Sequence, residues 1–177
     1  MEGITVKIQS VRNGKTLLFS RPALNADDLK FFDFTDEYQS ACAIIFALAR
    51  YENDQNDSVA MLDVVMGPES PNAFTTGFIK DQFRQYPYVV RSYFGGASVS
   101  NNYSVNDSCL SLTFTENPYS REQDGYVKLF IRSAGADSER SVTLRRKAST
   151  GEWFLFSDSY KGLLAGIRVP SAADPWA

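Results

Sequence analysis

The sequence predicts an α+β fold, with about three helices packed on a curved antiparallel sheet of four to six strands. Two observations predict it. Apolar residues between residues 35 and 85 recur at helical spacing, and after residue 88 they alternate with polar residues. Strands with one apolar face belong to antiparallel sheets that bury that face only. Helices grouped apart from strands in the chain favour helices packed on one side of the sheet.

Two short strands and three helices account for the first half of the chain. The strands are expected over residues 4–8 and 16–19. The first helix should begin near Thr35 or Asp36, with the Thr35 side chain as its cap and Asp36 at the positive end of its dipole, and end near Tyr51. Its middle is apolar all round, which predicts a helix buried on most sides. The second helix is expected over residues 58–66 with Asp57 as its cap, and the third over 74–85.

The second half is expected to supply most of the sheet. Residues 88–94 are rich in aromatic and β-branched side chains, and the alternating strands cover 110–115, 127–132 and 142–147. Residues 153–156 form the next strand, and a last short strand is expected over 163–169. Such a sheet would twist around the buried helix. In element order alone this is similar to the cone of the nuclear-transport-factor-2 fold.

Length and composition predict one soluble domain, residues 1–177, in the cytoplasm. The first residues lack the pattern of a signal peptide, and the longest apolar run, residues 41–49, is far shorter than the ~20 residues of a membrane span. A net charge of -3 argues against a nucleic-acid partner. We expect Cys42 and Cys109 to be reduced thiols. Oligomeric state is not predicted.

The chain contains no histidine, which excludes His-based nucleophile activation and His-ligated metals. Two cysteines are too few for a Cys-rich metal cluster. No metal or cofactor is therefore expected. Carboxylate, Tyr, Lys or Ser–Lys chemistry remains, or no chemistry at all, and the absence of catalytic motifs favours a protein that is not an enzyme.

Several segments together resemble an uncharacterised bacterial family, a domain of unknown function found chiefly in Gram-positive anaerobes. The resemblance covers roughly residues 24–177 and implies no activity, cofactor or partner. Val99 stands where the family pattern has proline, and Glu139 where it has Ser-Pro-Arg, which puts in doubt a function that depends on that turn. The resembling pieces are residues 43–51, 61–63, 67–68, 78–81, 91–94, 96–97, 101–103, 117–120 and 125–130, and most strongly 135–138, Arg140, 142–145, 151–155, 167–168 and 174–177.

The segment 132–147 is the densest in charged side chains, and it predicts a binding site formed by Arg132, Asp137, Arg140 and Arg145. Guanidinium groups suit carboxylate or phosphate ligands, and Gly135 would let backbone amides approach. The alternative, which we favour, is a hairpin whose Asp137 caps the turn and whose arginines lie on a solvated face.

Trp176, in the final Asp-Pro-Trp-Ala, has two interpretations. It either fills an apolar groove and anchors the end of the chain, which we favour, or serves as the anchor for a partner protein.

Three further polar features are expected to be structural. Residues 52–57 are expected to form a solvated connector, and Asn101 is expected to bond its own loop backbone. Asp63 should lie on the solvent edge of its helix; if it were buried, it would need a partner such as Arg91.

We therefore expect a non-enzymatic module that binds a protein partner. The alternative is a small-anion-binding or carboxylate-dependent enzyme with a pocket between helices and sheet.

Overall fold

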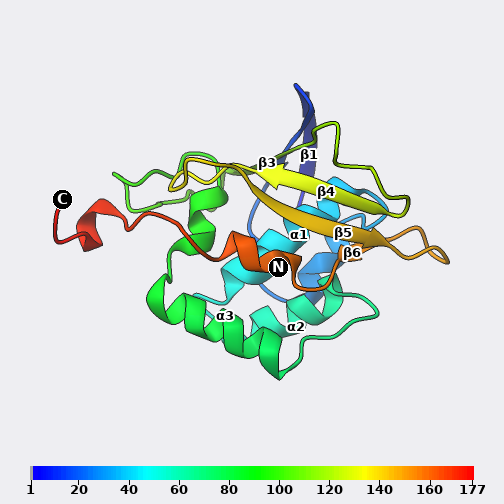
Figure 1. Ribbon diagram of the computed structural model, residues 1–177, viewed down its shortest axis with the longest axis horizontal. Coiled ribbons are helices and arrows are strands. Elements are labelled where there is room, and N and C mark those ends of the chain that lie inside the picture. The colour runs from blue at the N-terminus through cyan, green and yellow to red at the C-terminus, as the bar shows by residue number, and fades with distance from the viewer. Residues whose placement is uncertain (1) are drawn as a thin grey trace.

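The computed structural model describes residues 2–177 and shows an α+β fold (Figure 1). Six antiparallel strands form one sheet in chain order: β1 (Val6–Val11), β2 (Gly14–Phe19), β3 (Leu110–Thr115), β4 (Tyr126–Ile131), β5 (Arg140–Arg146) and β6 (Trp153–Leu155). The α-helices are α1 (Glu37–Arg50), α2 (Gln55–Val65) and α3 (Ala73–Gln85), and short 3-10 helices are η1 (Ala26–Phe31), η2 (Val89–Tyr93), η3 (Ser159–Leu163) and η4 (Ser171–Ala173). The fold class predicted from the sequence is confirmed.

Helix α1 lies against the inner face of the sheet, and α2 and α3 form the next layer (Figure 1). Residues 41–48 of α1 are at most 1% exposed, because the apolar run meets strands on one side and helices on the other. The inner sheet face adds Leu17, Leu112, Leu129 and Leu144, all at most 1% exposed. Since α1 fills the concave side of the sheet, the core there is packed side chain against side chain.

The helix boundaries follow side-chain caps. Asp36, and not the expected Thr35, caps α1 by accepting from the Tyr38 backbone N–H at 3.0 Å. Helix α2 begins three residues earlier than expected, because Asp54, and not Asp57, accepts from the Asp57 backbone N–H at 2.9 Å. Asn72 and Thr75 form a reciprocal capping box at the start of α3.

Two segments differ from the expected strands. Residues 88–94, despite their aromatic and β-branched content, form η2, whose backbone N–H groups bond locally. Residues 163–169 form no strand. Gly166 has a φ of +73°, and the Arg168 N–H bonds to the Gly135 carbonyl at 2.9 Å, outside any ladder.

Gly67 and Gly135 permit close packing between distant segments. A Cβ at Gly67 would lie 2.5 Å from the Phe154 ring, and one at Gly135 would lie 2.1 Å from the Tyr103 hydroxyl. Gly135 was expected to let backbone amides approach an anion, but its close packing against Tyr103 already explains the glycine.

Within residues 2–177, no helix is both long and apolar enough to cross a membrane.

Candidate functional site

The structure does not gather the charged residues of segment 132–147 into one site. Arg132 is 86% exposed and lies 3.9 Å from Glu139, while Asp137 forms an ion pair with Arg168. Arg140 donates from Nη2 to the Gly166 carbonyl at 3.0 Å, which ties β5 to the following chain.

Arg140 and Arg145 lie on opposite faces of β5. They are an odd number of residues apart, and side chains alternate along a strand. Arg140 pairs in register with Ile131, a core residue, whereas Arg145 pairs with Tyr126 and lies over its ring at 5.5 Å. Their Cα atoms are separated by about 17 Å along the strand. The segment is dense in charge, but its arginines do not converge, and a role in binding stays a prediction for each of them.

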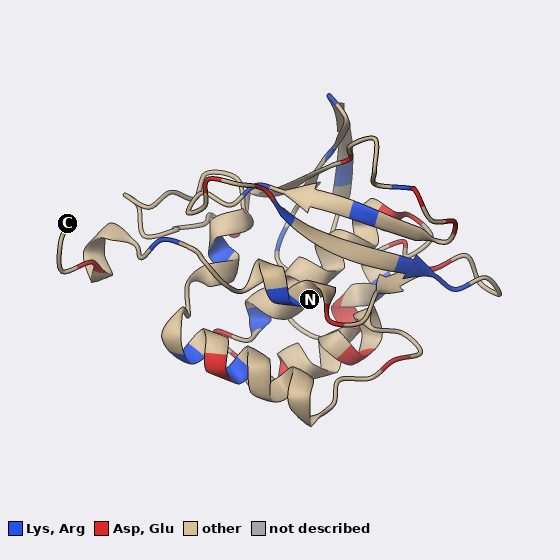
Figure 2. Ribbon diagram, viewed as in Figure 1, with Lys and Arg blue, Asp and Glu red and all other residues tan. Residues whose placement is uncertain are grey.

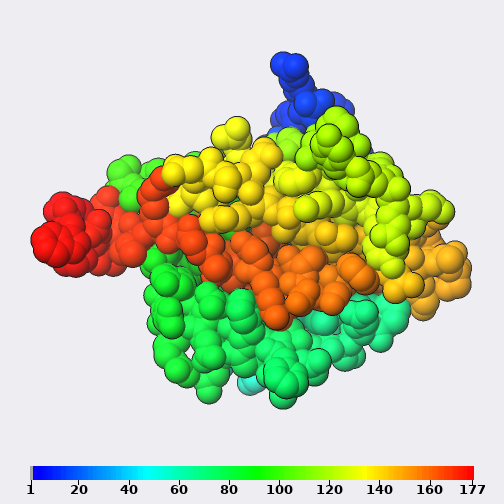
Figure 3. Space-filling model, in the orientation of Figure 1, coloured from blue at the N-terminus to red at the C-terminus, as the bar shows by residue number. Residues whose placement is uncertain are grey.

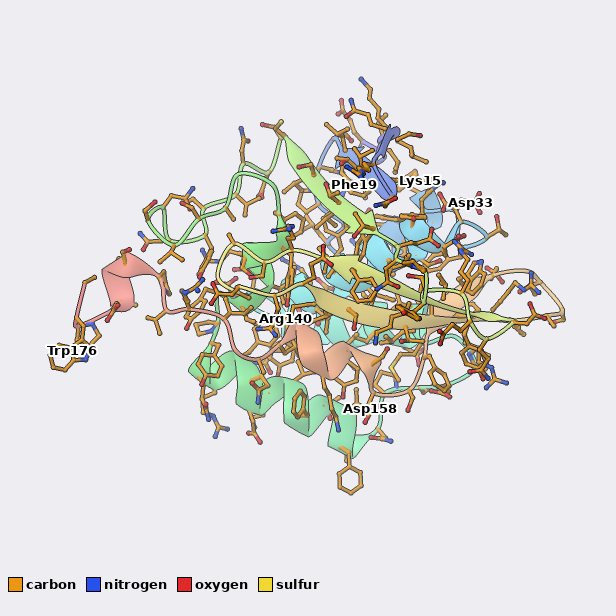
Figure 4. All side chains as sticks on the ribbon, turned by 45° about the horizontal axis from the view of Figure 1, so that its top comes forward. Lys15, Phe19, Asp33, Arg140, Asp158 and Trp176 are labelled. Carbon is orange, nitrogen blue, oxygen red and sulfur yellow. The ribbon has the colours of Figure 1, made fainter. Side chains whose placement is uncertain are left out.

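Trp176 is 93% exposed, so the favoured interpretation that it fills an apolar groove is wrong. The chain is held just before it, where the Tyr103 hydroxyl donates to the Arg168 carbonyl at 2.7 Å and the Ala172 N–H donates to Asn102 Oδ1 at 3.1 Å. Beyond these bonds the tail projects from the body of the molecule (Figure 3). Figure 4 shows the Trp176 ring far from Arg140, which lies near the middle of the molecule.

The expectations for Asn101 and Asp63 are confirmed, whereas the expected connector 52–57 is wrong in part, because α2 already begins at Gln55. Asn101 Oδ1 accepts from the backbone N–H groups of Ser98 at 2.9 Å and Ser104 at 3.1 Å, as a loop-stabilising asparagine should. Asp63 is exposed on α2. Arg91 was the partner expected for Asp63 if Asp63 were buried. In the structure Arg91 pairs with Glu52.

A hollow of about 320 Å³ lies between the C-terminal end of α1, η2 and the start of β3; we call it the α1 pocket. Its floor is apolar, with Phe46, Phe94 and Leu110 all buried. Its rim is charged and comes from three separate segments of the chain. The rim side chains are Arg50, Glu52, Arg91 and Asp107.

Both arginines of the rim are already engaged. Arg91 donates from Nε to Glu52 Oε2 at 3.1 Å, and from Nη1 to the carbonyls of Asn102 at 2.8 Å and Tyr103 at 3.4 Å. Arg50 Nη2 lies 3.3 Å from Asp57 and 3.8 Å from Asp54. The buried Arg50 Nε has no hydrogen-bond partner among residues 2–177. Both guanidinium groups therefore already face carboxylates, while the Arg50 Nε donor stays open to an acceptor.

The two carboxylates of the rim are less well satisfied. The Glu52 side chain is 25% exposed, and burial raises its pKa, against the opposing effect of Arg91. Asp107 has no ion pair within 4.0 Å in the part of the chain that the structure describes. A partly desolvated carboxylate beside an apolar floor is a feature of binding sites.

Sequence reasoning missed this pocket. It assigned residues 52–57 to a solvated connector and weighed Arg91 only as a partner for Asp63. The one signal available was the pair Arg50 and Glu52 at the end of an apolar helix. That pattern is also typical of an ordinary helix terminus.

A second charged cluster joins the start of α1 to the end of β3, around Glu116. The Tyr38 hydroxyl donates to Glu116 Oε2 at 2.5 Å, and Arg121 Nε donates to Glu116 Oε1 at 2.6 Å. Arg121 also pairs with Glu37, and Lys15 Nζ lies 4.9 Å from the centre of the Tyr38 ring. These bonds lower the pKa of Glu116, while burial raises the pKa of Tyr38. The cluster satisfies its own charges and fastens α1 to the sheet.

The fold and pocket define an α+β domain with a charged rim over an apolar floor. The chain belongs to the family described as Domain of unknown function (DUF6935), whose model matches residues 25–171. The resemblance to an uncharacterised family is thereby confirmed, while the bacterial range of that family stays a prediction. Searches of curated proteins and of solved structures found no match, so the nuclear-transport-factor-2 analogy stays a prediction.

Proposed function

We propose that the α1 pocket binds a small ligand that carries an apolar group and a protonated amine. The observation that carries the proposal is the Glu52 carboxylate, partly buried at the edge of an apolar floor and shared with a single arginine. Asp107, on the same rim, adds a carboxylate without an ion pair among the described residues.

The charge balance of the rim supports an amine over an anion. Arg91 is bound to Glu52 and two carbonyls, and Arg50 is flanked by two aspartates, Asp54 and Asp57. The charge left over is therefore negative. An incoming carboxylate or phosphate could reach only the Arg50 Nε donor and would meet an excess of carboxylates, whereas an ammonium group would be attracted to them.

The floor supports an aromatic or alkyl group of modest size. Phe46 and Phe94 lie 5.5 Å apart between ring centres and present aromatic surface, which favours apolar and cationic groups. The pocket is near the lower end of the range for small-molecule sites, roughly 300–1,000 Å³. The proposal is binding alone and includes no chemical step.

The test compares two probes that share a phenyl group and differ in charge: 2-phenylethylamine and 3-phenylpropionate. At a free concentration of about 100 times its dissociation constant, the amine should raise the free energy of unfolding by roughly 2.7 kcal/mol. For a chain of this size that is a rise in Tm of about 5–10 °C. The carboxylate should have little effect. A larger shift with the carboxylate than with the amine would overturn the proposal.

Glu52→Gln should abolish the amine-dependent shift. The matched control is Glu122→Gln, an exposed glutamate outside the pocket, which should respond as the unmodified protein does. Binding should also strengthen as the pH rises through the pKa of Glu52, because the ammonium group pairs with the ionised carboxylate.

A second function, the protein-interaction module expected from the sequence, is favoured by the exposure of Trp176. Aromatic side chains are frequent anchors in interfaces, and this one projects from a chain segment that is fixed at its base. Deleting residues 174–177 should weaken capture of a partner without lowering the Tm, and a large loss of Tm would contradict this function.

We also propose that the protein works in a reducing compartment such as the cytoplasm. Cys42 is buried, Cys109 is exposed, and the two are not paired. An exposed free thiol is typical of proteins kept reduced.

A further inference from the structure

A groove of about 350 Å³ lies between the turn after α2 and the β5–β6 hairpin; we call it the β5 groove. Its apolar wall includes Met66, Pro68, Phe154 and Phe156. Its charged lining has three cations and one carboxylate: Arg145, Arg146, Lys147 and Glu69. It shares no lining residue with the α1 pocket.

The cations of the β5 groove are free to accept a partner. Arg145, Arg146 and Lys147 are exposed, and none has an ion pair within 4.0 Å in residues 2–177. Arg145 and Arg146 lie over the rings of Tyr126 and Trp153, at 5.5 and 5.9 Å. A groove with apolar rings and unpaired cations suits a segment that has both an aromatic side chain and a carboxylate.

The tail formed by Asp174, Pro175 and Trp176 is such a segment. Trp176 is exposed, and its backbone N–H donates to Asp174 Oδ1 at 2.8 Å, which fixes the local turn. Oxygen Oδ2 of Asp174 remains available. The tail lies at one end of the long axis and the β5–β6 hairpin at the other (Figure 1), with acidic colour on the tail and basic colour on the end of β5 (Figure 2).

We propose that the tail of one copy docks in the β5 groove of a second copy of this chain. Trp176 packs against Phe154 with Arg145 over its ring, and Asp174 faces Lys147. This inference rests on the interaction function proposed for Trp176 and names its partner. Because tail and groove lie at opposite ends, each added copy presents a free tail or groove, so association is head-to-tail and open-ended.

Sedimentation of the full chain over a range of concentrations, at low and high salt, tests the inference. The weight-average mass should rise with concentration at low salt. The association should weaken at least tenfold at about 0.5 M salt, where charges are screened over a few ångströms. Trp176→Ala should sediment as a monomer throughout. The control Tyr119→Ala, an exposed aromatic outside groove and tail, should associate as the unmodified chain does.

Mixing two defective variants gives the decisive readout. Trp176→Ala keeps its groove, and Arg145→Glu with Lys147→Glu keeps its tail, so each alone should be monomeric and their mixture should form a 1:1 pair. Unchanged Tm values check that both variants fold. A mixture that stays monomeric, or a Trp176→Ala variant that still associates, overturns the inference. If the unmodified chain is monomeric at every concentration yet retains another protein through Trp176, the inference fails and the interaction function stands.

Discussion

Glu52 and Glu116 both pair with an arginine, yet their pKa values shift in opposite directions. Glu116 accepts hydrogen bonds from Tyr38 and Arg121, and these outweigh burial and lower its pKa. Glu52 has Arg91 alone, and burial outweighs that contact and raises its pKa. The difference shows what separates a structural ion pair from a binding site: the number of partners that the carboxylate already has.

The floor of the α1 pocket should give the largest effect, since it belongs to the core. Phe46 is 1% exposed and meets Phe19 edge-on at 4.9 Å. We expect Phe46→Ala to lower the free energy of unfolding by about 3–5 kcal/mol in urea titrations. Phe74→Ala, at a site 89% exposed, should change it by less than about 0.5 kcal/mol. A loss below about 1 kcal/mol for Phe46→Ala would show that the pocket floor is not part of the stabilising core.

Glu116→Gln should lower the free energy of unfolding at pH 7 by about 1–2 kcal/mol, because the charge-assisted bonds to Arg121 are lost. A pKa lower in the folded state than in the unfolded state gives stability that is present above the ordinary value of 4.5 and is lost as the pH falls through the folded value. The difference between variant and unmodified protein should therefore shrink toward pH 3. A difference that does not change with pH would show that Glu116 is not held ionised.

Glu52→Gln should have a smaller effect of the opposite sign. A pKa raised in the folded state gives stability that is present below 4.5 and is lost as the pH rises through the folded value. At pH 7 the half-buried carboxylate lowers the stability of the folded state. The amide removes that cost of burying a charge, but it also loses the ion pair with Arg91. The side chain is partly exposed, so we expect a gain of at most about 0.5 kcal/mol by chemical denaturation. A loss above about 1 kcal/mol would make Glu52 a structural residue like Glu116.

The Arg132–Glu139 pair supplies a solvent-exposed reference for the other two. Its atoms lie 3.9 Å apart, and the side chains are 86% and 42% exposed. Arg132→Ala should change the free energy of unfolding by no more than about 0.5 kcal/mol. A larger loss, measured under the same conditions, would show that exposure alone does not rank the three pairs.

The fold was largely predictable, because its signals are local. The apolar run 41–49 predicted a buried helix, and the alternation at residues 110–115 and 142–147 predicted strands that the structure contains at 110–115 and 140–146. Residues 88–94 were misleading because composition favours a strand there, whereas the N–H groups of Val89, Arg91 and Phe94 bond to the carbonyls three residues before them. The true cap of α2, Asp54, competed with Asp57 three residues later, and spacing alone did not separate them.

The candidate site was not predictable, because it depends on long-range contacts. Glu52 and Arg91 are far apart in the chain and meet only when η2 packs beside α1. Charge density pointed instead to residues 132–147, where strand alternation turns neighbouring arginines to opposite faces. Trp176 was assigned to a groove by its apolar character, yet within the described residues it is 93% exposed.

Carbon-detected NMR titration of the glutamate side-chain carboxyl groups tests the central contrast most directly. The account predicts that Glu52 titrates above the ordinary value of 4.5 and Glu116 below it. Addition of 2-phenylethylamine should lower the pKa of Glu52 and leave that of Glu116 unchanged. A Glu52 that titrates at or below Glu116 would contradict the distinction between the two pairs, and with it the assignment of the α1 pocket as the binding site.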